Sequence, residues 1–178
     1  ILAALLLTSV QSVSVVSVPH GDTAQGIVSG GVGFFQQPAD GAISQLGFLM
    51  TFQVEPRDWW LRPSFGGLME ASFGTNRLID GHILAGGELV AAKAIYFKPF
   101  IGAFGDFGWA NYTTTAATYN GLVYGFLLSV GTEIRFTDRD HAVGMRLTTA
   151  YRFLMGTIGG GLAGSDLNSI MVLLGVTF

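Results

Sequence analysis

The chain has 178 residues, of which 49% are hydrophobic, and its 9 basic and 12 acidic residues leave a net charge of −3. This length suits one domain. So few charges, nearly balanced in sign, exclude a disordered polyelectrolyte and a nucleic-acid binder with a broad basic face. The sequence contains no cysteine, which excludes disulfides, thiolate metal sites and cysteine nucleophiles.

The first segment, residues 1–25, is apolar and rich in serine and valine. Ile1 to Leu7 is similar to the apolar region of a secretory signal, but no positively charged residues precede it. The serines that follow make residues 1–21 a poor transmembrane helix, and Ser9 to Val18 is prone to form a strand. Two interpretations stay open: a signal remnant, or a retained extension that docks onto a partner.

From Gly26 onward the apolar residues recur with period 2, which is typical of strands with one apolar face. Eight such runs lie between clusters of turn residues, and most reach the about 9 to 11 residues of a tilted membrane strand. The sequence therefore predicts an all-β fold, an eight-stranded antiparallel transmembrane β-barrel over residues 26–178. The expected strands are Gly26–Gln36, Ser44–Val54, Leu61–Thr75, Gly81–Ile95, Lys98–Tyr112, Leu122–Phe136, Ala142–Phe153 and Leu167–Phe178.

The other face of these strands is polar. In the sixth run Leu128 and Val130 share one face, whereas Ser129 and Glu133 share the other. A soluble surface normally carries about 25 to 35% charged residues, so the sparse, balanced charges favour an enclosed interior in which each charge is paired. The alternative is a lipocalin-like soluble carrier with its apolar face inward. The expected barrel-interior ion network comprises Arg62, Glu70, Glu88, Asp106, Glu133, Arg135, Arg146 and Arg152.

The connections between these runs also differ in length. Longer ones are expected at one end of the barrel, over residues 37–43, 76–80, 113–121 and 154–166, and shorter ones at the other, over 55–60, 96–97 and 137–141. Aromatic residues near both rims predict interfacial girdles. One girdle would comprise Trp59, Trp60, Tyr96, Phe97, Phe136 and Phe178, and the other Phe73, Trp109, Tyr112, Tyr151 and Phe153.

Two segments carry a resemblance to a known family. Residues 169–178 alternate and end on Phe178, and so resemble the C-terminal assembly signal of bacterial outer-membrane barrels. Lys98 to Gly108 resembles a strand of the small OmpA-like and lipid A deacylase-like barrels. The resemblance implies insertion by the outer-membrane assembly machinery, contact with outer-membrane lipids and lipopolysaccharide, extracellular loops and periplasmic turns.

Catalytic groups are scarce. The deacylase-like family uses a His and a Ser on one strand, but the matching stretch, residues 144–151, has Thr148 and Thr149 where the histidine is needed. Asp80, His82 and Ser165 form a conceivable Ser-His-Asp set, although solvated rim residues are the simpler interpretation. No His or carboxylate pair has metal-ligand spacing. We therefore expect no catalytic residue, metal or cofactor.

Eight strands enclose a lumen that side chains largely fill, so the interior charges predict a structural ion network and not a conducting pore. The resulting hypothesis is a structural, anchoring or accessory subunit of an envelope assembly, without an open pore, that contacts other envelope proteins through residues 1–25 and binds no nucleic acid. The alternative is an outer-leaflet hydrolase or acyltransferase that modifies lipid A or phospholipid and uses His82.

Overall fold

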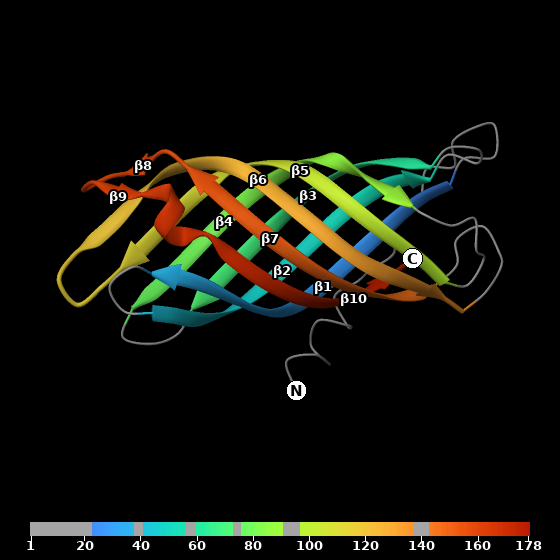
Figure 1. Cartoon of the computed structure of the whole chain (residues 1–178), viewed down its shortest axis with the longest axis horizontal. Helices are drawn as coiled ribbons and strands as arrows, with labels where there is room; N and C mark the ends of the chain where they lie inside the picture. The colour runs from blue at the N-terminus through green and yellow to red at the C-terminus, as the bar shows by residue number, and fades with distance from the viewer. Residues whose placement is uncertain (1–22, 38–40, 56–59, 73–75, 91–96, 137–142) are drawn as a thin grey trace.

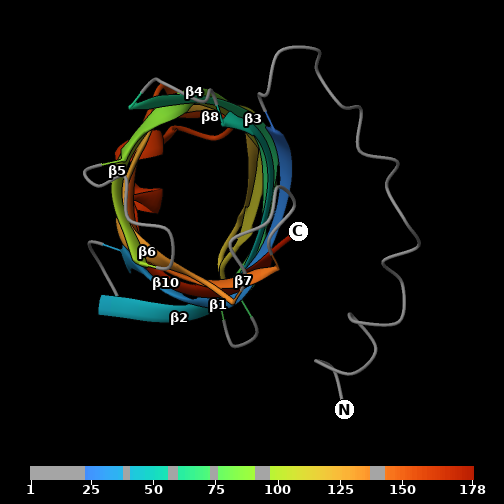
Figure 2. The same cartoon turned by 90° about the vertical axis from the view of Figure 1, so that its right-hand side faces the viewer.

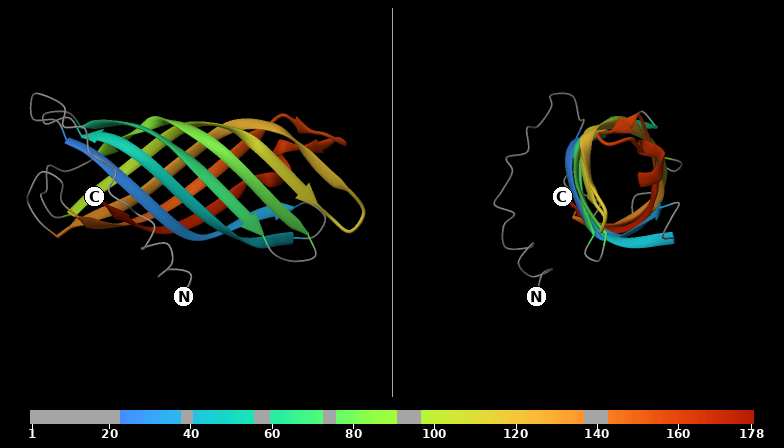
Figure 3. Two further views of the ribbon diagram at one scale, coloured as in Figure 1. Left: turned by 180° about the vertical axis from the view of Figure 1, so that it is seen from behind. Right: turned by 90° about the vertical axis from the view of Figure 1, so that its left-hand side faces the viewer.

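The computed structural model describes residues 23–37, 41–55, 60–72, 76–90, 97–136 and 143–178. Eight long strands form one closed antiparallel barrel in the order β1-β10-β7-β6-β5-β4-β3-β2, and they run obliquely to its long axis (Figures 1 and 3). Among the described residues, no helix is long and apolar enough to cross a membrane. The strands are β1 (Thr23–Gln37), β2 (Gly41–Glu55), β3 (Leu61–Ser72), β4 (Arg77–Val90), β5 (Phe97–Thr113), β6 (Thr118–Arg135), β7 (Gly144–Met155) and β10 (Ser169–Thr177).

The first and last strands close the barrel. β1 pairs with β10 from Ile27 opposite Thr177 to Phe35 opposite Ser169. Beyond this ladder, the amide of Gly26 donates to the carbonyl of Phe178 at 2.8 Å and the amide of Phe178 donates back at 2.9 Å. Viewed end-on, the strands form a ring (Figure 2). We call the rim where β1 begins and β10 ends the chain-end rim, and the opposite one the far rim.

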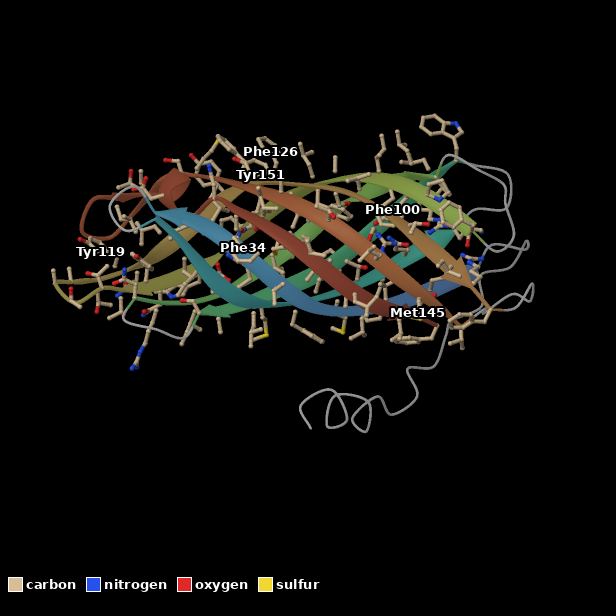
Figure 4. All side chains as sticks on the ribbon, turned by 60° about the horizontal axis from the view of Figure 1, so that its bottom comes forward. Phe34, Phe100, Tyr119, Phe126, Met145 and Tyr151 are labelled. Carbon is tan, nitrogen blue, oxygen red and sulfur yellow. The ribbon has the colours of Figure 1, made fainter. Side chains whose placement is uncertain are left out.

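Side chains alternate between the interior and the outer surface as the period-2 pattern predicts. Along β7 every second residue is buried from Gly144 to Leu154. Outward residues are large and apolar, as with Phe126, Leu128 and Val130, each more than half exposed, and Phe126 and Tyr151 project from the wall (Figure 4). An apolar outer surface fits lipid, not water. The soluble-carrier alternative is therefore wrong.

The predicted difference in loop length is wrong for three of the four far-rim connections. β1 ends at Gln37 and β2 begins at Gly41, β4 begins at Arg77, and β5 ends at Thr113 before β6 begins at Thr118. The Thr, Asn and Tyr residues that suggested a loop continue the β5–β6 ladder instead, with Tyr112 opposite Tyr119. Aromatic and β-branched side chains favour such cross-strand pairs, so this hairpin extends beyond the apolar surface.

The last connection is long, as expected, but it is folded. It contains β8 (Thr157–Ile158), β9 (Leu162–Ala163) and the 3₁₀ helix η1 (Gly164–Leu167). Gly160 and Gly161 have φ of +93° and +92°, values that suit glycine and allow the tight turn between β8 and β9. The amide of Gly159 donates to the carbonyl of Asn120 at 3.1 Å, which attaches the residue after β8 to the beginning of β6. We call residues 156–168 the cap.

The cap closes the far rim with apolar side chains. Tyr112 stacks on Tyr119 with ring centroids 6.4 Å apart. Tyr112 is buried, so its assignment to an interfacial girdle is wrong; its even position on β5 places it inside with Asp106. Of the girdle residues predicted at the other rim, Trp60, Phe97 and Phe136 are exposed, as lipid contact requires, whereas Trp59 and Tyr96, like Phe73, lie outside the described residues. The buried cluster that we call the cap core comprises Leu78, Ala110, Tyr112, Val123, Leu154, Ile158 and Leu167.

Candidate functional site in the charged interior

The interior is arranged in polar and apolar layers. The inward side chains of β4, taken from the far rim, are Leu78, Asp80, His82, Leu84 and Glu88. Leu78 belongs to the cap core, and Leu84 belongs to a second buried apolar cluster, the central apolar layer. Charged residues therefore lie on both sides of this layer. The central apolar layer comprises Leu49, Leu68, Leu84, Phe104, Leu127, Ala150, Met171 and Leu173.

Five charged residues near the chain-end rim form what we call the rim cluster. Glu133 accepts a hydrogen bond from Nη1 of Arg62 at 2.9 Å and one from Nε of Arg135 at 2.6 Å. Glu55 accepts one from Nζ of Lys98 at 2.5 Å and one from Nη2 of Arg62 at 3.2 Å. Arg135 also pairs with Glu55. Two carboxylates thus bind three cations, and the side chains of Glu55, Lys98 and Arg135 keep 18%, 12% and 11% of their surface exposed.

A single ion pair lies between the rim cluster and the central apolar layer. Nη1 of Arg146 donates to Glu88 at 3.0 Å, and Nη2 of Arg146 pairs with the other carboxylate oxygen. The guanidinium carbon lies 3.7 Å from the centre of the Phe100 ring, and Nε donates to Thr148 at 3.2 Å. This two-pronged pair is the geometry that best compensates a buried guanidinium.

Beyond the central apolar layer lies the buried acid cluster, formed by Glu70, Asp80, His82, Asp106 and Arg152. Nη2 of Arg152 lies 2.9 Å from Asp80 and also pairs with Glu70. The ring of His82 lies between two acids, with Nδ1 2.5 Å from Asp106 and Nε2 3.3 Å from Asp80. The side chains of Glu70, Asp80, His82 and Arg152 are fully buried.

Most of these pairs cross the lumen. Arg62 is the cross-strand neighbour of Glu88, and Arg146 is the neighbour of Glu133. The two guanidiniums nevertheless bind the opposite acids, so that Arg62 joins β3 to β6 and Arg146 joins β7 to β4. Arg152 likewise joins β7 to β3 and β4. The pairs therefore connect walls that no backbone ladder connects.

All eight residues predicted for the interior network have inward side chains in ion pairs. They do not form one network, because the central apolar layer separates Glu70, Asp106 and Arg152 from the other five. The predicted network did not include four residues that belong to these clusters, Glu55, Asp80, His82 and Lys98. The period-2 pattern on β4 contained the signal, because Asp80 and His82 occupy the same even positions as Glu88.

His82 was expected at a solvated rim, and this expectation is wrong: its ring is in the buried acid cluster, within the span of β4. Ser165 is exposed in η1. Both ring nitrogens of His82 face aspartates, so the conceivable Ser-His-Asp set is not assembled. The other two histidines of the sequence, His20 and His141, lie outside the described residues. Within the described ranges, no group of three or more His, Asp or Glu side chains is arranged to hold a metal ion.

Comparisons with known proteins agree on the fold. No protein-family profile and no curated protein sequence matches the chain. Among solved structures, Neisserial surface protein A (NspA) is similar with a TM-score of 0.71 at 12% identity, over 88% of this chain and 97% of that one. The N-terminal β-barrel domain of Pseudomonas aeruginosa OprF has a TM-score of 0.60 at 10% identity, over 87% and 96%. The attachment invasion locus protein Ail of Yersinia pestis has a TM-score of 0.53 at 13% identity, over 87% and 99%. The chain therefore has the fold of the small eight-stranded β-barrels of bacterial outer membranes.

Proposed function

We propose that this protein is a closed outer-membrane barrel that acts as a structural, anchoring or accessory subunit of the cell envelope, without a pore and without enzymatic activity. The observation that supports this is the layered interior. The central apolar layer and the cap core both cross the lumen, and the charged side chains between them are enclosed, with Arg152 paired to Glu70 and Asp80. A conducting path needs continuous hydration, which two apolar layers oppose.

The alternative of a lipid-modifying enzyme gains no support from the site. A hydrolase or acyltransferase of this kind needs a nucleophile beside its base and access to lipid. His82 faces two aspartates in the interior, whereas the outer surface that would meet lipid is apolar. The buried charges thus suit cross-bracing of the barrel better than acyl transfer.

The proposal includes an orientation and partners. The chain-end rim would face the periplasm, and the far rim with its cap would lie outside the cell. Residue Phe178, whose backbone completes the β1–β10 seam, would be read by the outer-membrane assembly machinery. Residues 1–25 would contact other envelope proteins, and the apolar outer wall would contact lipid and lipopolysaccharide.

Conductance in planar lipid bilayers tests the closed lumen. The purified protein is expected to give no steady channel current at neutral pH. A positive control is a variant that loses side chains from both apolar layers, Leu84→Gly and Phe104→Gly in the central apolar layer and Tyr112→Gly and Leu167→Gly in the cap core, which is expected to conduct. Long-lived, ion-selective openings of the unmodified protein would overturn the proposal.

The orientation and the partner contact need separate tests. The sequence has no cysteine, so Thr115→Cys introduces a single thiol at the tip of the β5–β6 hairpin, and a membrane-impermeant maleimide should label it in intact cells. Failure to label until the outer membrane is permeabilised would reverse the orientation. Deleting residues 1–18 should remove copurifying envelope proteins from mild-detergent extracts; if every partner stayed, the docking role would be wrong.

A further inference from the structure

The buried acid cluster contains more acids than cations. Glu70, Asp80 and Asp106 contribute three carboxyl groups, and Arg152 is the only permanent cation among them. The residues directly opposite the cluster on β2, β6 and β10 are Gly47, Leu127 and Ser169, and none of the described residues at this level adds another charge. An uncompensated charge buried in this way is very costly. Protons must therefore supply the missing positive charge.

The first such proton belongs to His82. A neutral imidazole has one N–H and one lone pair, whereas an imidazolium has two N–H groups. Nδ1 of His82 lies 2.5 Å from a carboxylate oxygen of Asp106 in hydrogen-bond contact, and Nε2 lies 3.3 Å from one of Asp80, so two negative groups flank the ring and favour a positive charge on it. Gly108, directly opposite on β5, makes room for the ring, because a Cβ there would lie 2.5 Å from the imidazole. The geometry therefore selects the imidazolium.

The second proton belongs to the acids. Three ionised carboxylates against two cations still leave one negative charge. Glu70 and Asp80 are direct cross-strand neighbours, and both pair with the same nitrogen of Arg152. Two like charges placed this close do not both ionise in an interior of low dielectric constant. One proton shared by this acid pair makes the cluster neutral.

The two sides of the cluster are closed to different degrees. Toward the chain-end rim lie the central apolar layer, the Glu88–Arg146 pair and the rim cluster. Toward the far rim, the cap core is the one apolar layer among the described residues, and it depends on Ile158 and Leu167 from the short cap. Water that hydrates the cluster would therefore enter most readily through the cap.

We propose that the barrel folds with two captured protons, one on His82 and one shared by Glu70 and Asp80, and that loss of these protons at alkaline pH releases the cap. The folded state then binds more protons than the unfolded chain, in which Glu and His titrate near about 4.3 and 6.5. Between pH 5.5 and 9 the free energy of unfolding should therefore be highest at the acid end and fall as pH rises, because the unfolded state binds fewer protons than the folded state. This inference does not depend on the subunit role.

Urea unfolding of the full chain in phospholipid vesicles, from pH 5.5 to 9, tests the proton count. Each captured proton makes the unfolding constant rise by up to about tenfold per pH unit. Glu70→Gln keeps the shape of the protonated acid but removes the shared proton. The logarithm of its unfolding constant should therefore rise less steeply with pH than that of the wild type, by the contribution of one proton. Glu88→Gln is the matched control: it lowers stability but keeps the wild-type slope. The wild type and Glu70→Gln have all other titratable groups in common, so the difference between their slopes reports on the buried acid cluster.

A wild-type unfolding constant that is flat or falls with rising pH would overturn the proposal without reference to any variant. Equal slopes for wild type and Glu70→Gln would overturn the shared proton. The cap is tested separately with Ala110→Cys, a buried position in the cap core. Its labelling rate, divided by that of the exposed Thr115→Cys at each pH, should rise at least tenfold between pH 6 and 9 while the barrel remains folded. A constant ratio would overturn release of the cap.

Discussion

At the scale of single residues, the charged side chains of this barrel bind partners across the lumen. Arg62 and Arg146 each pass over the acid beside them on the neighbouring strand and bind one further away. The backbone ladders already fix adjacent strands to one another, so these pairs add stability against deformation of the ring. If one member of a pair is removed, however, the charge of the other member stays buried without a partner, which is destabilising.

Removing either member of the Glu88–Arg146 pair should therefore be far more harmful than removing both. Arg146→Met and Glu88→Met are each expected to lower the free energy of unfolding by about 3 to 5 kcal/mol. The double variant Glu88→Met with Arg146→Met should lie close to the wild type. Urea unfolding in vesicles gives all three values. If the two single losses simply added in the double variant, the pair would not be a coupled unit.

Gly108 tests the position of His82 without changing any charge. In Gly108→Ala the new Cβ would lie 2.5 Å from the imidazole ring of His82 and even closer to the carbonyl oxygen of Gly81, so the ring, the β4 backbone or both must shift. We expect a loss of about 1 to 3 kcal/mol in the free energy of unfolding. Gly105→Ala is a suitable control, because Gly105 is exposed and its Cβ would meet its nearest atom only at 3.7 Å. Equal losses for the two variants would contradict a specific clash with His82.

At the scale of elements, sequence periodicity specified the strands well, and the connections poorly. Alternation is set by backbone geometry, so the inward and outward faces of β6 and β7 could be read directly. The ends could not. The Thr and Asn residues at 111–120 are equally compatible with a loop, and only pairing with the opposite strand selects the extended hairpin. The cap core joins β4, β5, β6 and β7 to the cap. These contacts are between residues far apart in the sequence, and a local sequence pattern cannot predict them.

The cap is expected to be the most easily opened element. Truncating Leu167, which is fully buried in the cap core, should cost about 2 to 5 kcal/mol of local stability because it leaves a cavity. Leu167→Ala should therefore make residues 156–168 sensitive to added protease while β7 and β10 stay intact. Ser165→Ala, an exposed neighbour in η1, should leave cleavage unchanged. Uniform proteolysis of the whole barrel would instead show that the cap and the strands open together.

At the scale of the whole molecule, the outer wall determines where the protein can reside. Leu128 and Phe136 both face outward on one side of the barrel, Leu128 within β6 and Phe136 at the chain-end rim. Together with its neighbours, this wall forms a continuous apolar surface suited to lipid. Interior composition has little influence on this location, because its charges are enclosed.

A charge on this wall should cost more near the centre of the membrane than at its edge. Leu128→Arg is expected to lower the free energy of unfolding in vesicles by about 2 to 4 kcal/mol, and Phe136→Arg by about 0 to 1 kcal/mol. The comparison uses the same introduced side chain at two depths. Similar costs at both positions would contradict the placement of the membrane around β6.

The seam between β1 and β10 has a consequence for biogenesis. Its two strands are the most distant in sequence, and the hydrogen bonds between Gly26 and Phe178 extend it to the chain-end rim. Contacts of such long sequence separation form slowly. A nascent chain that lacks β10 leaves β1 with an unpaired edge, which lipid cannot satisfy. Synthesis of β10 therefore has to finish before insertion of the barrel into the membrane can be completed.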